Sequence, residues 1–281
     1  MTDLRKKVIQ GVGWRAAADG GQALLQIIFT AILARILDIA DFGLVAMCLV
    51  FLRFVRAFMD VGFGSAIIQS QSISEGQISA LFLTQVGLRL AIFVICVAGA
   101  PLAAGFFAQP VLADLIPILA LAVILDSAAF PEVIAGKALN FRGYSLLSLM
   151  ANVIGNAVGL GFALAGFGVW SLIYRVLAEK CAYVSLIWGV VGWRPSRPVW
   201  GGLVQFFRFG ATMFVSNFLN FLSQNLATII IGKFVGVEAL GLFNVAYNLA
   251  IVPAQKIKTI LSTVFTPAFA SLQAAVGQLR Q

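Results

Sequence analysis

The sequence predicts an all-α, polytopic membrane protein that contains two parallel copies of one helical unit. Hydrophobic residues make up 61% of the 281 residues, and only 11% are charged. A soluble domain typically carries about 25% charged and about 45–50% apolar residues, so most of this chain requires lipid as its solvent. The second observation is an internal repeat. Ala34–Leu44 matches Gly232–Leu242 without gaps, and the same offset aligns Gln26 with Gln224.

Four apolar stretches open the chain, each near the roughly 20 residues that a helix needs to cross a bilayer. The first is too long for the apolar part of a cleavable signal peptide. Short polar connectors end the first three: Asp38–Asp41, Gln69–Gly76 and Ala108–Pro110. The fourth contains the pair Phe130-Pro131, where proline frees backbone carbonyls. The expected spans are 14–37, 43–68, 78–105 and 113–134.

Four further stretches follow, and they are expected at 144–166, 168–192, 203–231 and 241–266. The two longest connectors, Ala135–Gly143 and Trp193–Gly202, precede the first and the third of these. No connector could hold a soluble catalytic domain. The matched stretches place the seventh and eighth spans in the same register as the first and second. Residues 1–200 are therefore expected to form a six-helix N-lobe, and residues 201–281 the first two helices of a C-lobe.

Parallel repeats are usually of similar size, so four more helices are expected beyond Gln281, either in a longer form of the chain or in a partner.

Lysine and arginine favour cytoplasmic connectors. The odd-numbered connectors carry only Arg35 and Lys233, each near an acid. The N-terminus and the even-numbered connectors carry most of the others, so the N-terminus is predicted to be cytoplasmic. These residues are Arg5, Lys6, Lys7, Lys137, Arg142, Arg194, Arg197, and Lys256 and Lys258 past the middle of span eight.

Several functional classes are disfavoured. The chain has no histidine, the commonest general base and metal ligand. Its three cysteines, Cys48, Cys96 and Cys181, lie singly inside apolar stretches without metal-binding or disulfide spacing. The basic residues form no basic and aromatic module that would indicate nucleic-acid binding. We therefore expect no enzyme activity, no cofactor, no metal site and no nucleic-acid partner.

Polar side chains recur on one face of two spans that the repeat relates. Span seven matches the spacing of span one, and the two stripes either face each other across a hydrated cleft or bond to neighbouring helices within each lobe. The candidate binding residues are Asp19, Gln22 and Gln26 in span one, and Asn217, Asn220 and Gln224 in span seven.

Charged side chains inside spans mark further candidates. Arg53, Arg56 and Asp60 share one face of span two. A guanidinium fits phosphate, so this pair indicates an anionic substrate, and internal charge pairing is the alternative. Arg175 forms an i, i+4 pair with Glu179 in span six.

Two further patterns concern spans four and five. Asp126 and Glu132 flank the Phe130-Pro131 pair and could carry a coupling ion, H⁺ or Na⁺, or could cap a kink. Gly155 and Gly159 form a G-x-x-x-G pattern, with Asn152 and Asn156 beside it. That pattern predicts close helix packing with amide cross-links.

The chain resembles the Wzx-type oligosaccharide flippases of bacterial polysaccharide export, within the multidrug/oligosaccharidyl-lipid/polysaccharide superfamily. Four stretches carry the resemblance: Asp60–Gln69, Gly166–Leu172, Trp193–Pro195, and Phe265–Gln273 with Pro253 before it. Their order and spacing extend over the whole chain.

The resemblance implies two six-helix lobes in a V and a multi-pass protein of the bacterial inner membrane. It also implies that undecaprenyl-diphosphate-linked oligosaccharide is flipped for polysaccharide biosynthesis, with membrane lipid and a polysaccharide polymerase complex as partners. The family's cationic cavity maps by position onto Arg53, Arg56 and Arg175. Two alternatives stay open: a cation-coupled multidrug exporter of the same superfamily, and a non-transporting scaffold of a polysaccharide assembly complex.

Overall fold

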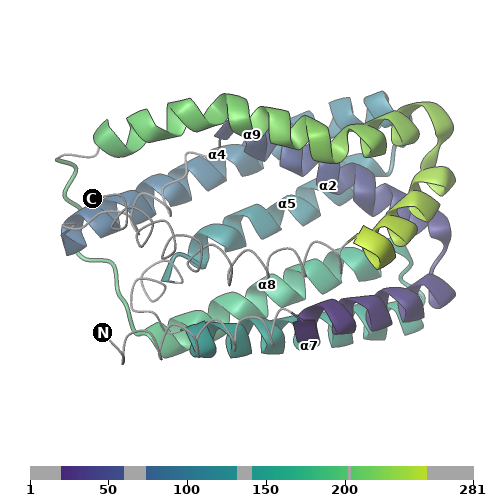
Figure 1. Ribbon diagram of the computed structural model, residues 1–281, viewed down its shortest axis with the longest axis horizontal. Coiled ribbons are helices and arrows are strands. Elements are labelled where there is room, and N and C mark those ends of the chain that lie inside the picture. The colour runs from purple at the N-terminus through teal and green to yellow at the C-terminus, as the bar shows by residue number, and fades with distance from the viewer. Residues whose placement is uncertain (1–19, 60–73, 132–140, 202–203, 252–281) are drawn as a thin grey trace, which may run out of the picture.

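The computed structural model describes residues 20–59, 74–131, 141–201 and 204–251, and the regular structure in these ranges is helical (Figure 1). The all-α prediction is therefore confirmed. The helices lie roughly along one common direction, as in a bundle that crosses a bilayer. They are Gly20–Ile36, α2 (Ile39–Met59), α4 (Glu75–Phe107), α5 (Leu112–Ala128), α7 (Phe141–Leu164), α8 (Val169–Val191), α9 (Val204–Ile230), a π-helical turn η1 (Ile231–Val235), and Val237–Ile251.

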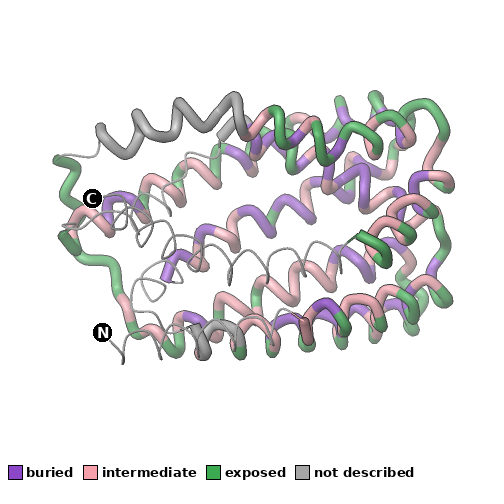
Figure 2. Tube along the Cα trace, viewed as in Figure 1, coloured by how far each residue is buried: buried purple, intermediate pink, exposed green. Residues whose placement is uncertain are grey.

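Apolar side chains cover much of the outside of the bundle. Leu24, Leu102 and Phe234 are 64%, 77% and 80% exposed, a pattern suited to lipid contact (Figure 2). Three described segments are long and apolar enough to cross a membrane: Glu75–Phe107, Leu146–Leu164 and Asn217–Val235. The polytopic membrane class is confirmed by these segments, whereas the expected total of eight spans stays a prediction.

Helix α4 begins three residues before the predicted span. Ser74 is the N-cap, its hydroxyl accepts from the Gln77 backbone N–H at 3.3 Å, and the Gln77 side chain accepts from the Ser74 backbone N–H at 3.1 Å. This reciprocal pair is a capping box, which satisfies two backbone donors at the helix start. The S-x-x-Q pattern that specifies it is visible in the sequence.

The core is centred on α5. Leu115, Ile116 and Leu119 are fully buried, and α2, α4 and α8 contribute side chains to the same cluster. Helix α5 ends at Ala128, six residues before the predicted end of its span at residue 134. The buried helix therefore holds its neighbours in place and fixes where their polar side chains emerge.

Helices α7 and α8 pack closely because two glycines leave room between them. A methyl group on Gly155 would lie 2.6 Å from Glu179 Cβ, and one on Gly159 would lie 2.6 Å from Arg175 Cβ. The predicted G-x-x-x-G packing is confirmed. The turn between the helices uses positive φ angles at Gly166 and Gly168, which glycine adopts without strain.

Helix α8 starts against the beginning of α2. The Asp41 carboxylate accepts hydrogen bonds from the backbone N–H groups of Asp38 and Val169, the latter being the first residue of α8. Burial raises the pKa of the Asp41 carboxyl, the neighbouring Asp38 adds to that rise, and the two backbone bonds oppose it. This connector carboxylate thus ties the start of α8 to the start of α2.

The connector that follows α8 folds back onto the start of α4. Val199 donates its backbone N–H to the Gly76 carbonyl at 2.9 Å, and Ser196 donates its own to the Ser79 hydroxyl at 2.9 Å. The passage from residues 1–200 to the last described helices is therefore anchored on α4.

The two repeat copies meet through a reciprocal contact. A methyl group on Gly43 would collide with the Val237 carbonyl, and one on Gly241 would collide with the Ile39 carbonyl. The repeat offset of 198 aligns residue 39 with residue 237 and residue 43 with residue 241. Each copy therefore contacts the other through the same two positions. Such reciprocity is typical of a local two-fold axis. The division into lobes at residue 200 stays a prediction that this symmetry supports.

We expect Gly43→Ala to lower the free energy of unfolding by about 1–3 kcal/mol, because the added methyl group overpacks the contact with Val237. Gly87→Ala in α4 is the matched control, since a methyl group there has no neighbour within 4 Å. Replacing a helical glycine by alanine in open space usually stabilises by about 0.5–1 kcal/mol. Thermal unfolding of the purified protein in detergent checks both, and equal shifts would contradict the close contact.

Candidate functional site

A polar pocket of about 230 Å³ lies between α2 and α9. It brings together five of the residues that the sequence singled out, from two segments that are far apart along the chain. Two arginines come from α2 and three amides from α9. The lining residues are Arg53, Arg56, Ala57, Asn217, Asn220, Phe221, Gln224 and Asn225.

The Arg53 side chain is exposed in this pocket, and one of its guanidinium nitrogens is bound to α9. Its Nη1 donates to Asn225 Oδ1 at 3.1 Å, and Asn225 Nδ2 donates in turn to the Phe221 carbonyl at 2.9 Å. Asn225 is only 3% exposed, so its side chain is a fixed support. A guanidinium has five N–H donors, and the one side-chain bond that Arg53 makes to the described residues leaves others available to a ligand.

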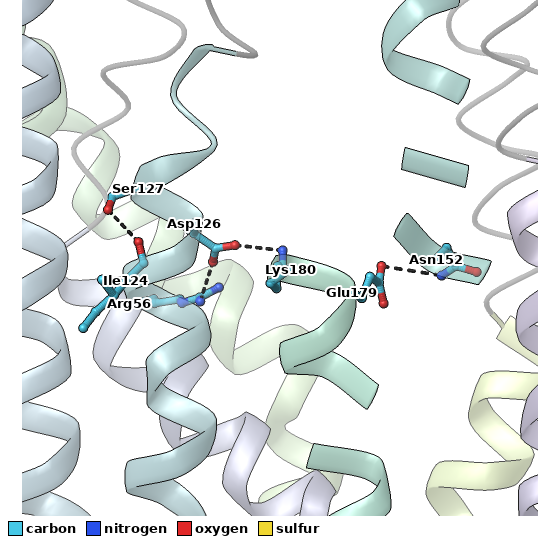
Figure 3. Close-up of polar contacts among 7 residues, drawn as sticks. All are labelled: Arg56, Ile124, Asp126, Ser127, Asn152, Glu179 and Lys180. Carbon is cyan, nitrogen blue, oxygen red and sulfur yellow. Dashed lines mark hydrogen bonds and ion pairs between the residues drawn. The ribbon is translucent and has the colours of Figure 1, made fainter. Parts of the chain in front are cut away.

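Arg56 belongs to a charge network that connects three helices. Its Nη2 lies 2.6 Å from Asp126 Oδ2 of α5, and Lys180 Nζ of α8 lies 2.7 Å from the other carboxylate oxygen, Oδ1 (Figure 3). Two cations share one carboxylate here, so the three side chains together carry a positive charge. The buried Arg56 Nε has no protein hydrogen-bond acceptor among the described residues.

The internal charge pairing given as the alternative is present for Arg56, which pairs with Asp126 of α5. Asp60 and Asp19 lie outside the described residues, so a contribution of either acid stays a prediction. Asp126 was expected to carry a coupling ion or to cap a kink; it bonds two cations. Glu132, its expected companion, also lies outside the described residues.

Arg175 occupies a different environment, between α7 and α8. Its Nε donates to Asn156 Oδ1 at 2.6 Å, Asn156 Nδ2 donates to Asn152 Oδ1 at 2.9 Å, and Asn152 Nδ2 reaches Glu179 Oε1 at 3.5 Å. Figure 3 shows the Asn152–Glu179 end of this chain of bonds. Arg175 does not line the polar pocket. The amide cross-links expected beside the glycines are present, and Arg175 takes part in them.

The stripe of the first span also lies apart from this pocket. Gln22 Nε2 donates to Ser148 Oγ of α7 at 2.7 Å, which is the bonding to a neighbouring helix given above as the alternative. Gln26 is half-buried in the helix Gly20–Ile36 and does not line the pocket. The pocket therefore pairs the seventh predicted span with the second, where the sequence suggested the first.

One site residue was missed from the sequence: Asn225, which supports Arg53. It is a polar residue within an apolar helix, which is a signal in its own right. Lys180 lies in span six beside the predicted Arg175–Glu179 pair, and it completes the charge network with Asp126. Within the described ranges, no three histidine, cysteine, aspartate or glutamate side chains lie close enough together to hold a metal ion.

Comparisons with known proteins place the chain among bacterial polysaccharide proteins. A family model described as "Polysaccharide biosynthesis protein" matches residues 32–281. "Teichuronic acid biosynthesis protein TuaB" of Bacillus subtilis is 29% identical over 280 residues, covering 96% of this chain and 57% of that protein. "Lipopolysaccharide biosynthesis protein WzxC" of Escherichia coli is 29% identical over 291 residues, covering 99% and 57%.

A third relative carries transport in its name. "Succinoglycan biosynthesis transport protein ExoT" of Rhizobium meliloti is 26% identical over 273 residues, covering 95% of this chain and 54% of that protein. The chain thus spans little more than half the length of the curated relatives it matches. No solved structure gives a significant match to it.

Proposed function

The chain belongs to the polysaccharide biosynthesis protein family, and from that premise we propose that it translocates a lipid-linked oligosaccharide across a bacterial inner membrane. The substrate class is an undecaprenyl-diphosphate-linked oligosaccharide made for polysaccharide biosynthesis. The observation that carries the proposal is the positively charged pocket between α2 and α9, whose arginines match a diphosphate.

The pocket offers two kinds of polar group for the two polar parts of such a substrate. Arg53 and Arg56 supply charge for the diphosphate, and Asn217, Asn220 and Gln224 supply amide donors and acceptors for sugar hydroxyl groups. The lipid chain stays in apolar surroundings while the polar head crosses. Exposure of the pocket to each side in turn, by movement of one repeat copy against the other, then completes transfer.

A cytoplasmic N-terminus, favoured by the lysine and arginine distribution, places the connector before α2 and the turn after α9 on the outer side. The family resemblance adds the direction of transfer that we propose, from the cytoplasmic to the outer leaflet. A coupling ion, H⁺ or Na⁺, and contact with a polymerase complex belong to the same proposal. A multidrug exporter for cationic compounds is disfavoured, since two arginines line the pocket and repel a cationic ligand.

The proposal is tested with the full chain reconstituted into phospholipid vesicles that contain a fluorescent undecaprenyl-diphosphate oligosaccharide. A membrane-impermeant quencher reports the fraction of substrate in the outer leaflet over time. We expect rapid equilibration between leaflets in vesicles with protein and none in protein-free vesicles. Equal rates in both would refute the proposed translocation.

A further inference from the structure

A second, apolar pocket of about 450 Å³ adjoins the polar one along the seam between α2 and α9. Helix α4 closes its far side. Its walls are apolar side chains, chiefly Phe51, Phe54, Leu102, Phe106, Phe221 and Ile229. A space of this composition suits a hydrocarbon chain and gives no partner to a sugar or a phosphate.

The two pockets share a wall. Phe221 lines both, and its ring lies 5.6 Å from that of Phe54, which lines the apolar pocket. Along α2, the apolar pocket uses residues 50–54 and the polar pocket residues 53–57, so their centres are separated by about one helical turn, roughly 5 Å. Contiguous polar and apolar sites of this kind fit one amphiphile, with its head in one site and the start of its chain in the other.

The order of the two pockets has a direction. Val50 lies nearer than Arg53 to the start of α2, Phe106 lies near the C-terminal end of α4, and Ile229 lies near the end of α9. Figure 1 shows the ends of α4 and α9 on the same side of the bundle as the start of α2. In the proposed orientation all three of these ends are on the outer side. The apolar pocket therefore lies on the outer-leaflet side of the arginines. A molecule that enters from the cytoplasm would reach the arginines first and the apolar pocket second.

A lipid in the cytoplasmic leaflet has the same order of polar and apolar parts as the two pockets. Its head lies on the cytoplasmic side, and its chain points toward the outer leaflet. A lipid in the outer leaflet has the opposite polarity and cannot fill both pockets in this order. We infer that the apolar pocket binds the head-proximal part of the polyisoprenyl chain while the diphosphate lies at Arg53, which makes the pair of pockets the loading site for substrate from the cytoplasmic leaflet. The inference rests on the proposed function and adds to it the place of the lipid chain.

The test uses the full chain in lipid nanodiscs with a polyisoprenyl diphosphate that carries a photoreactive diazirine near its head. We expect labelling of the segments around Phe54 and Leu102. Unlabelled polyisoprenyl diphosphate should compete for this labelling, and polyisoprenol of the same length should not, because it lacks the charged head. A phosphatidylglycerol with a diazirine in its acyl chain should label these segments no more than the rest of α4.

Leu102→Trp is the informative variant, because Leu102 is 77% exposed and a larger ring there fills the pocket without displacing the core. We expect it to lower labelling by the polyisoprenyl probe about tenfold. Leu90→Trp is the matched control: Leu90 is 52% exposed on the same helix and lies outside the pocket, so labelling should be unchanged.

Labelling by phosphatidylglycerol that equals labelling by the diphosphate probe, or competition by polyisoprenol, would show a pocket for bulk lipid and overturn the inference. The competition measurement uses the unaltered chain, so it decides the matter even where Leu102→Trp fails to fold. A failure of the inference is distinguishable from a failure of the proposed function. Translocation without specific labelling by the polyisoprenyl probe would contradict only the inference. Absence of translocation by the unaltered protein would contradict the proposed function.

Discussion

Replacing Arg53 with alanine is expected to lower the translocation rate of the full chain about ten- to a hundredfold at an unchanged level in the membrane. Hydrogen bonds to charged groups contribute about 1.5–3 kcal/mol, and each 1.4 kcal/mol corresponds to a factor of ten. The fold should tolerate the change, because Arg53 is exposed in the pocket and its protein partner Asn225 also lines that space. Initial rates in the vesicle assay, normalised to protein content, give the comparison.

Two controls sharpen this experiment. Arg53→Lys keeps the charge but loses the planar fork that matches a diphosphate, so an intermediate rate is expected. Arg35→Ala removes an exposed arginine that does not line the pocket, so it should transport as the unaltered chain does. Equal rates for Arg53→Ala and Arg35→Ala would remove Arg53 from the binding site.

Replacing Asp126 with asparagine is expected to lower the free energy of unfolding by about 3 kcal/mol, the lower end of the range for broken buried ion pairs. The carboxylate side chain is 17% exposed and bonds both Arg56 and Lys180, so its loss leaves two cations without their counter-charge. The lower end applies because Lys180 is 40% exposed and is partly screened. Unfolding in detergent, followed by tryptophan fluorescence, measures the change.

A triple variant separates charge burial from shape at this network. Arg56→Met, Asp126→Leu and Lys180→Met together replace the network by apolar side chains of similar size, a change that is often neutral or stabilising. We expect its stability to return close to that of the unaltered chain, with slow transport because one pocket arginine is gone. A triple variant as unstable as Asp126→Asn would show that the network is needed for more than mutual neutralisation.

The helical architecture was largely predictable because membrane helices follow from long apolar stretches. The main differences lie at helix ends, where local hydrogen bonding decides. The capping box of Ser74 and Gln77 starts α4 earlier than hydropathy indicates. The G-x-x-x-G prediction was confirmed because small residues at this spacing let two helices approach closely, and the neighbouring amides bond across the contact.

The site was predictable in its residue types and less so in its pairings. Arg53, Arg56, Asn217, Asn220 and Gln224 do share one pocket. The partners of the arginines could not be read from helical periodicity, which relates only residues on the same helix. Asn225 lies 172 residues from Arg53 and Asp126 lies 70 from Arg56, so these bonds depend on how the helices pack.

The reciprocal contact between the repeat copies has a mechanical consequence. Val237 and Gly241 lie just past η1, at one end of the long segment formed by α9 and its turn. Helix α9 has 27 residues and is therefore about 40 Å long at 1.5 Å per residue. If the contacts of α9 with α2 were released, a tilt of only about 10° about that end would displace the opposite tip by about 7 Å over that length. Small rearrangements at the contact between the two glycines would thereby be amplified at the far end of the helix.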